Sequence, residues 1–204
     1  MIKITFHAII IVLAFIGFNA IGGQKYVEMA KDAIGSFILA HNQEAVKKIA
    51  DFSKLNEEFQ VDKSVNLMGY KAVIAEHKAS GQKMVILDSG NKTLLTQEDI
   101  KGSGLDKKLN DLSEKFKYQG IRVKDIAVVS RGNIEIYGQT VPYAKFEAHV
   151  TKLPISEITG IVANVKTSDG AEKLALSLSE KKKYSQLITN EFFRGVHEGN
   201  KTTD

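Results

Sequence analysis

The chain opens with a long apolar segment, and this segment decides in which compartment the rest has to fold. Met1-Ile2-Lys3 supplies one positive charge, the stretch from Ile4 to Phe18 is almost wholly apolar, and small residues such as Ala20 and Gly22 follow. A charged start, an apolar centre and a small-residue end are typical of a secretory signal. We therefore predict that residues 1–23 direct export and that the remainder folds outside the cytoplasm.

Two fates of this segment remain open. Cleavage after Ala20-Ile21-Gly22 would leave a periplasmic or secreted domain. If the segment is retained, the 20 residues from Ile4 to Gly23 are long enough to cross a hydrocarbon layer of about 30 Å. Lys3 is the only charge before this stretch, so an uncleaved anchor would also leave the domain outside.

The sequence contains no cysteine. An exported chain of this kind has to be stabilised by packing alone, because it cannot form disulfides. The same absence excludes a cysteine-linked lipid anchor, thiol catalysis, iron–sulfur clusters and thiolate zinc sites.

Composition gives no sign of nucleic-acid binding. The 28 basic and 24 acidic side chains leave a net charge of +4, and the basic residues are spread along the chain. The one run, Lys181–Lys183, is interpreted as a solvated turn or helix start. With 43% hydrophobic residues, most of the 204-residue chain is expected to be folded.

Residues 24–60 are predicted to be a helical segment. Val27, Ala30, Ile34 and Ile38 recur at helical spacing, and the apolar pattern continues to Phe59. The pattern fits one bent helix or a pair of helices. Such a segment could cover a sheet, or it could form a stalk or partner-binding helix beside the membrane.

Residues 66–198 are predicted to form an α+β domain. An alternating pattern over Tyr70–Ala75 and Met84–Leu87, with a turn at Ala79-Ser80-Gly81 between them, predicts a β-hairpin. The apolar spacing from Leu105 to Phe116 predicts an amphipathic helix. Ser185 is expected to cap a last helix before the polar tail, residues 199–204. Further strands are predicted at Ile121–Val129 (with a bulge at Lys124-Asp125), Ile134–Ile136, Val141–Val150, Ile158–Val165 and Leu174–Leu178. Around the last of these, Ser177 and Ser179 alternate with leucines, which predicts a strand with one face in contact with water.

The predicted fold class is therefore α+β: an antiparallel sheet of about six strands with helices packed on it, preceded by the N-terminal helical segment. Over Tyr70–Val196 this order of elements resembles the α/β/α sandwich of PsbP-type photosystem accessory proteins and of the Ran-binding protein Mog1. The resemblance implies an accessory or adaptor domain, exported in many bacteria, without catalysis of its own. No residue motif carries it, so it implies no site residues.

No catalytic, metal or cofactor motif is recognised. His41, His77, His149 and His197 lie far apart, and none has the i, i+4 partner of a helical zinc site. We expect His77 and His149 to face solvent; the alternative is that folding brings the two together in a cluster. There is no Gly-x-Ser-x-Gly nucleophile elbow, so no catalytic residue and no cofactor is predicted.

Tyr137 and Tyr143 are the candidate partner-binding residues. They flank a turn at Gly138-Gln139 beside Pro142, which belongs at a sheet edge or strand start because it cannot donate to a ladder. Exposed aromatic side chains there could bind a partner. The alternative, which we favour, is that both rings pack beneath the last helix.

We predict a non-enzymatic, exported or membrane-anchored accessory or binding protein of the bacterial envelope. Its partner is expected to be a protein or an envelope component, and its only membrane contact to be the N-terminal segment. The first alternative is a carrier of a small apolar ligand, which needs an enclosed apolar cavity. The second is a hydrolase with an unconventional site, which needs a concave cluster of histidine and carboxylates.

Overall fold

The computed structural model describes residues 43–67, 70–88, 90, 94–114, 123–151 and 157–199. The predicted export segment (1–23), the first part of the predicted helical segment (24–42) and the tail after Gly199 lie outside these residues. Within the described residues, no helix combines the length and the apolar character needed to span a membrane.

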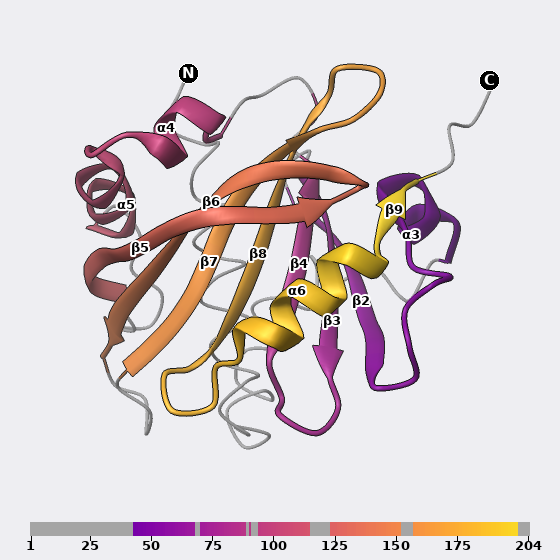
Figure 1. Cartoon of the computed structure of the whole chain (residues 1–204), viewed down its shortest axis with the longest axis horizontal. Helices are drawn as coiled ribbons and strands as arrows, with labels where there is room; N and C mark the ends of the chain where they lie inside the picture. Colours follow the sequence, from indigo (N-terminus) through magenta and orange to yellow (C-terminus); the bar gives the residue numbers. More distant parts are fainter. Residues whose placement is uncertain are drawn as a thin grey trace.

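A seven-stranded sheet forms the centre of the domain (Figure 1). The strand order is β2-β3-β4-β8-β7-β6-β5, and every neighbouring pair is antiparallel. The strands are β2 (Phe59–Leu67), β3 (Tyr70–His77), β4 (Lys83–Asp88), β5 (Val123–Ile136), β6 (Gln139–Val150), β7 (Glu157–Lys166) and β8 (Glu172–Glu180). The predicted α+β class with a large antiparallel sheet is confirmed.

The helical prediction for residues 24–60 is wrong in its last part. Helix α3 spans only Gln43–Ile49, strand β1 (Ala50–Asp51) follows directly, and β2 begins at Phe59. The reason is tertiary: Ile49, Phe59 and their neighbours bury apolar side chains against the sheet, and β2 gains a ladder with β3. A helical spacing of apolar residues is therefore not sufficient to form a helix when a sheet edge is available.

Helices lie on both faces of the sheet. Helix α6 (Gln186–Gly195) crosses one face in Figure 1, and α3 lies at its end beside the short strand β9 (His197–Glu198). On the other face, α4 (Gln97–Lys101) lies by β6 and β7, and α5 (Leu105–Glu114) lies by β5. Two of the helix starts have a cause in the sequence: Thr96 and Asp99 form a capping box for α4, and the Ser185 hydroxyl accepts a hydrogen bond from Ile188 N–H at the start of α6.

Two apolar clusters, one on each face, make up the core. The α5-side core takes residues from β3, β4, β5, β6, β7 and β8 together with α4 and α5, including Leu105 and Leu109. The α6-side core includes Phe192 and Phe193, both of which are fully buried, together with Val46, Ile49 and Ala50 from the α3–β1 segment. The α3–β1 segment therefore shares a core with the sheet.

Strand β5 is longer than predicted and carries the predicted bulge. The two expected strands, Ile121–Val129 and Ile134–Ile136, are parts of one strand from Val123 to Ile136. Its pairing with β6 shifts between Lys124 and Ala127, and Asp125 adopts a positive φ of 53°. A bulge of this kind twists a long edge strand and limits pairing with other chains.

Helix α5 closes the outer edge of β5. The Asn110 side chain accepts a hydrogen bond from Ile126 N–H and donates one to the Ile126 carbonyl, as a neighbouring strand would. Asp106 accepts a further bond from Val128 N–H, at 3.2 Å. These side chains satisfy backbone groups that would otherwise form an open edge.

Candidate functional site

Both candidate tyrosines are half-buried and pack against the α6-side core. The Tyr137 hydroxyl donates to the Ile49 carbonyl at 3.3 Å, and burial holds the pKa of this phenol far above its usual range. The Tyr143 ring covers Gly132 on the paired strand, where an added Cβ would lie 2.9 Å from the ring. These contacts support the packing interpretation, and partner binding by the two residues remains a proposal.

The hairpin turn between β5 and β6 lies at Tyr137-Gly138, one residue earlier than the predicted turn at Gly138-Gln139. Tyr137 and Gly138 have φ values of 54° and 69°, the conformation of a two-residue type I′ hairpin turn. Glycine adopts this conformation freely, whereas tyrosine rarely does. The turn therefore keeps a strained residue whose ring and hydroxyl reach the core.

Pro142 is not at the start of β6 as predicted: it is the fourth residue of the strand and pairs with Asn133 of β5. It lies just outside the ladder between β6 and β7, which begins at Tyr143, so its missing N–H leaves no bond to β7 unmade.

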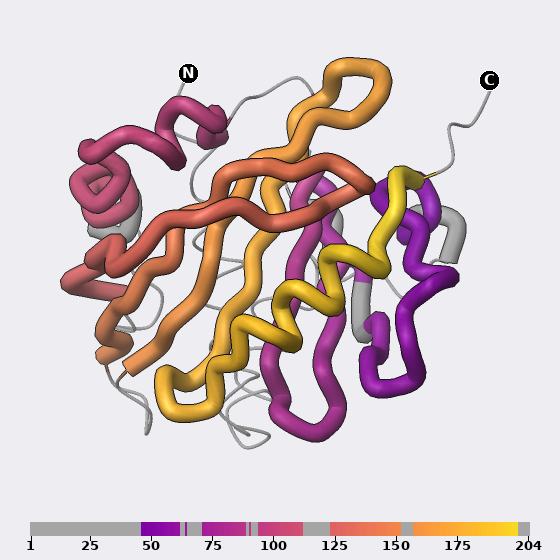
Figure 2. Tube along the Cα trace, in the orientation of Figure 1, coloured from indigo at the N-terminus to yellow at the C-terminus, as the bar shows by residue number. Residues whose placement is uncertain are grey.

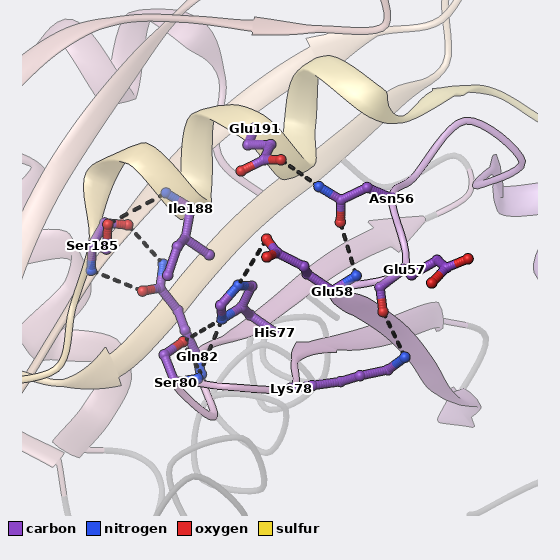
Figure 3. A network of polar contacts seen from close by, with 10 residues as sticks. All are labelled: Asn56, Glu57, Glu58, His77, Lys78, Ser80, Gln82, Ser185, Ile188 and Glu191. Carbon is purple, nitrogen blue, oxygen red and sulfur yellow. Dashed lines mark hydrogen bonds and ion pairs between the residues drawn. The ribbon is translucent and has the colours of Figure 1, made fainter.

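The most extensive buried polar group centres on Gln82, at the end of the β3–β4 turn (Figure 3). Its Nε2 lies 2.7 Å from Thr189 Oγ1, 2.9 Å from Ser177 Oγ and 3.0 Å from the Ser185 carbonyl oxygen. Its Oε1 accepts a hydrogen bond from Ser185 N–H at 2.8 Å. We call Gln82, Ser177, Ser185 and Thr189 the Gln82 network; it joins the β3–β4 turn, β8 and the start of α6.

This network explains why one strand prediction was wrong. The sequence predicts that the serines of β8 face water, but Ser177 and Ser179 are as buried as the leucines that alternate with them. Helix α6 covers this face, and Ser177 bonds to both Gln82 and Thr189. A polar strand face can be buried when another element supplies its hydrogen bonds.

Next to this network, His77 is buried rather than exposed as predicted. It is 7% exposed and packs edge-to-face against Phe59, with ring centroids 5.3 Å apart. His77 Nδ1 accepts a hydrogen bond from Ser80 N–H and lies 3.0 Å from Ser80 Oγ. His77 Nε2 faces Glu58 Oε2 at 3.6 Å (Figure 3). This places a serine, a histidine and a carboxylate in one row, which is the arrangement of a nucleophilic triad.

The hydrogen bonds of the backbone around Ser80 indicate that Ser80, His77 and Glu58 have a structural role. Ser80 N–H donates to His77 Nδ1, Gly81 N–H donates to the His77 carbonyl, and Gln82 N–H donates to Ser80 Oγ. An acyl-transfer site needs free N–H donors beside the nucleophile to stabilise an oxyanion. Here all three N–H groups close the turn, and Gly81 supplies the positive φ of 70° that the turn requires.

His149 lies on the surface, as predicted, and away from His77. The side chain is 54% exposed and sits between Asp125, 3.8 Å from Nδ1, and Glu157, 3.7 Å from Nε2. The two carboxylates face different ring nitrogens, so they do not converge on one position. Among the described residues, no group of three or more histidine and acidic side chains could hold a metal ion. Strands β4, β8 and β7 separate β3 from β6, so His77 and His149 form no cluster.

Sequence reasoning missed the Gln82 network, and one signal could have found it. A glutamine directly after the turn Ala79-Ser80-Gly81, a serine in an apolar strand and a threonine on the apolar side of α6 are each polar residues at inward positions. Each has an ordinary surface interpretation by itself, and only the fold places them together.

Comparisons with known proteins give a weak structural likeness. No family model matches the chain, and no curated protein matches it. Among solved structures, it is similar to the solution structure of cyanobacterial PsbP (CyanoP) from Synechocystis sp. PCC 6803, at 16% identity and a TM-score of 0.33. The match covers 68% of this chain and 90% of that chain. This weak PsbP-like resemblance agrees with the one indicated by the order of elements, and no role is transferred from it.

Proposed function

We propose that the chain is a non-enzymatic accessory or binding protein of the bacterial envelope, exported or anchored by residues 1–23. The observation that supports the absence of catalysis is that the N–H groups around Ser80 are already used as hydrogen-bond donors within the turn. The serine, the histidine and the three nearby N–H groups all stabilise one turn and its junction with α6. The predicted export segment supports the location, and the absence of cysteine suits a domain that folds without disulfides.

Reaction of the purified full chain with a fluorophosphonate probe tests the non-enzymatic part. The proposal predicts no labelling that depends on Ser80. The matched control is Ser80→Ala, which removes the only hydroxyl beside His77 Nδ1 among the described residues. Labelling of the wild-type chain that disappears in Ser80→Ala would contradict the proposal and favour the hydrolase alternative, in which Ser80 is the nucleophile and His77 the base.

Binding is tested in living cells by a photo-crosslinking amino acid placed at one position at a time. Suitable positions are Leu187, 80% exposed on α6, and Val129, 48% exposed at the second bulge of β5. Tyr143 tests the proposed role of the two tyrosines, and the buried Leu176 is the negative control. A discrete adduct that depends on the position supports binding. Adducts at every position, or at none, would oppose it.

The carrier alternative makes a different prediction. A carrier purified from cells should retain a small apolar molecule that organic extraction releases and mass spectrometry detects. The proposal predicts that native mass spectrometry finds the mass of the bare chain. An added mass of a few hundred daltons that extraction removes would favour the carrier.

A further inference from the structure

We infer that the junction between Ile49 and Ala50 is a rigid joint, which fixes helix α3 at one position on the domain. The contacts that form the joint are independent of cellular location. Its consequence for an anchor rests on the proposed function, because it applies only if segment 1–23 is retained.

Two side chains from distant parts of the sequence bind one carbonyl at the end of α3. Lys173 Nζ, from β8, donates to the Ile49 carbonyl at 2.5 Å, and the Tyr137 hydroxyl donates to the same oxygen. Carbonyls in the last turn of a helix lack partners within the helix, and a cation there also meets the negative end of the helix dipole. Lys173 and Tyr137 therefore hold α3 to the sheet by its C-terminal end.

The next residues fix the chain from the other side. Ala50 and Asp51 pair with Glu198 and His197 in the two-stranded sheet β1–β9, and Figure 2 shows α3 and β9 together at one end of the domain. Gly199 then packs against the backbone of α3. An added Cβ would clash with the Lys47 carbonyl oxygen and would lie 2.9 Å from the Lys48 carbonyl carbon, closer than real Cβ atoms approach. This backbone-to-backbone contact opposes any movement of α3 toward Gly199.

The joint depends on a buried charge, which makes its geometry specific. Lys173 is 6% exposed, and its ammonium lies 6.0 Å from the Tyr137 ring centroid. Burial lowers the pKa of Lys173, while Asp88, Asp169 and Glu198 oppose this shift. A buried ammonium without its carbonyl acceptor would be strongly unfavourable. Displacement of α3 would remove that acceptor, so the lysine favours the docked position alone.

A pair of spin labels measures the rigidity directly, and the cysteine-free chain allows both labels to be placed without background. In the full-length chain, Lys47→Cys labels the exposed side of α3 and Leu187→Cys labels the exposed side of α6. Pulsed electron–electron resonance then gives the distribution of distances between the two helices. We expect one narrow distribution.

Two substitutions then test what holds α3 in place. Gly199→Ala inserts a methyl group against the α3 backbone, and Lys173→Met removes the ammonium at similar side-chain length. Either should broaden the distribution or add a second distance. Ser80→Ala, in the β3–β4 turn, is the control and should leave the distribution narrow. If Gly199→Ala prevents folding, Lys173→Met carries the test.

A broad distribution in the otherwise unaltered labelled chain would overturn the inference, and so would a narrow one in both Gly199→Ala and Lys173→Met. Neither result depends on where the protein resides in the cell. Failure of the joint and failure of the proposed function are therefore distinguishable: a cytosolic protein with a narrow distribution would refute the export proposal and retain the joint.

Discussion

The Gln82 network and the Ile49 joint solve the same structural problem with different chemistry. Each attaches a helix to the sheet through buried polar groups. The Gln82 network is neutral, and its glutamine is bonded at both side-chain atoms. The joint uses the ammonium of Lys173, whose pKa is lowered by burial. Neutral groups cost little to bury once they are hydrogen-bonded, whereas a buried charge retains a desolvation penalty.

The comparison implies different responses to mutation. Removing the centre of a satisfied neutral network leaves several buried partners unpaired, and each unpaired group is costly. Removing a buried charge also removes its own desolvation penalty, so the net loss is smaller. The following predictions test this difference, beginning with the largest expected effect.

Gln82→Leu should destabilise the domain most, by about 2–4 kcal/mol in the free energy of unfolding. The substitution leaves Ser185 N–H without its acceptor and removes the donor that reaches Thr189 Oγ1. Urea unfolding of the purified chain measures the effect. Gln97→Leu is the matched control: Gln97 is half-buried and donates to the Asn164 carbonyl at 3.2 Å, so it should cost much less. An equal loss of stability in Gln82→Leu and Gln97→Leu would contradict the claim that the Gln82 network contributes more than an ordinary glutamine hydrogen bond.

Lys173→Met should cost less, about 1 kcal/mol at neutral pH, because the lost hydrogen bond is offset by relief of the desolvation penalty. Its pH dependence has a definite sign. Folding lowers the pKa of Lys173 below the unfolded value of 10.5, so the unfolded chain binds more protons in the window just below 10.5. The wild type should therefore gain stability relative to Lys173→Met as pH rises toward that value. Parallel stability curves for the two proteins between pH 8 and 10 would refute this account, and the exposed Lys182→Met is the control.

Tyr137→Phe should cost about 0.5–1.5 kcal/mol, because it removes one hydrogen bond to the Ile49 carbonyl and keeps the ring. The raised pKa of Tyr137 means that this contribution is present below the unfolded pKa of 10.0 and is lost as pH rises above it. Unfolding followed below pH 9 therefore reports the hydrogen bond alone. Tyr143→Phe, which keeps the ring that covers Gly132, is the comparison. A larger loss of stability in Tyr143→Phe than in Tyr137→Phe would contradict this prediction.

Leu187→Ser should have the smallest effect, within about 0.5 kcal/mol, because the side chain is 80% exposed at the start of α6. Thermal unfolding provides the measurement. The result also validates this position for crosslinking and spin labelling. A loss comparable to that of Gln82→Leu would indicate that the first turn of α6 contributes to stability in a way that its exposure does not predict.

The parts of the fold that local pattern determines were predictable. The spacing from Leu105 onward indicated α5, the turn at Ala79-Ser80-Gly81 indicated the β3–β4 hairpin, and Ser185 indicated the start of α6. The bulge after Lys124 was also predicted. In each case, neighbouring residues specify the conformation without help from distant ones.

The errors have the opposite cause. Strand β2 forms because β3 supplies a partner, and the polar face of β8 is buried because α6 supplies Thr189. His77 is buried because Phe59 and the β3–β4 turn enclose it. The sequence does not show which of these residues contact one another in the fold. The local hydrophobic pattern therefore favoured a helix, a strand face in contact with water and an exposed histidine.

A double-mutant cycle between Gln82 and Thr189 tests most directly the central claim that these polar residues hold the fold together. The free energy of unfolding is measured for wild type, Gln82→Leu, Thr189→Val and the double variant. Replacing both partners leaves fewer unpaired groups than the single changes suggest, so the coupling energy should be at least about 1 kcal/mol. Costs that add to within about 0.5 kcal/mol would show that the two residues act independently and would contradict the account.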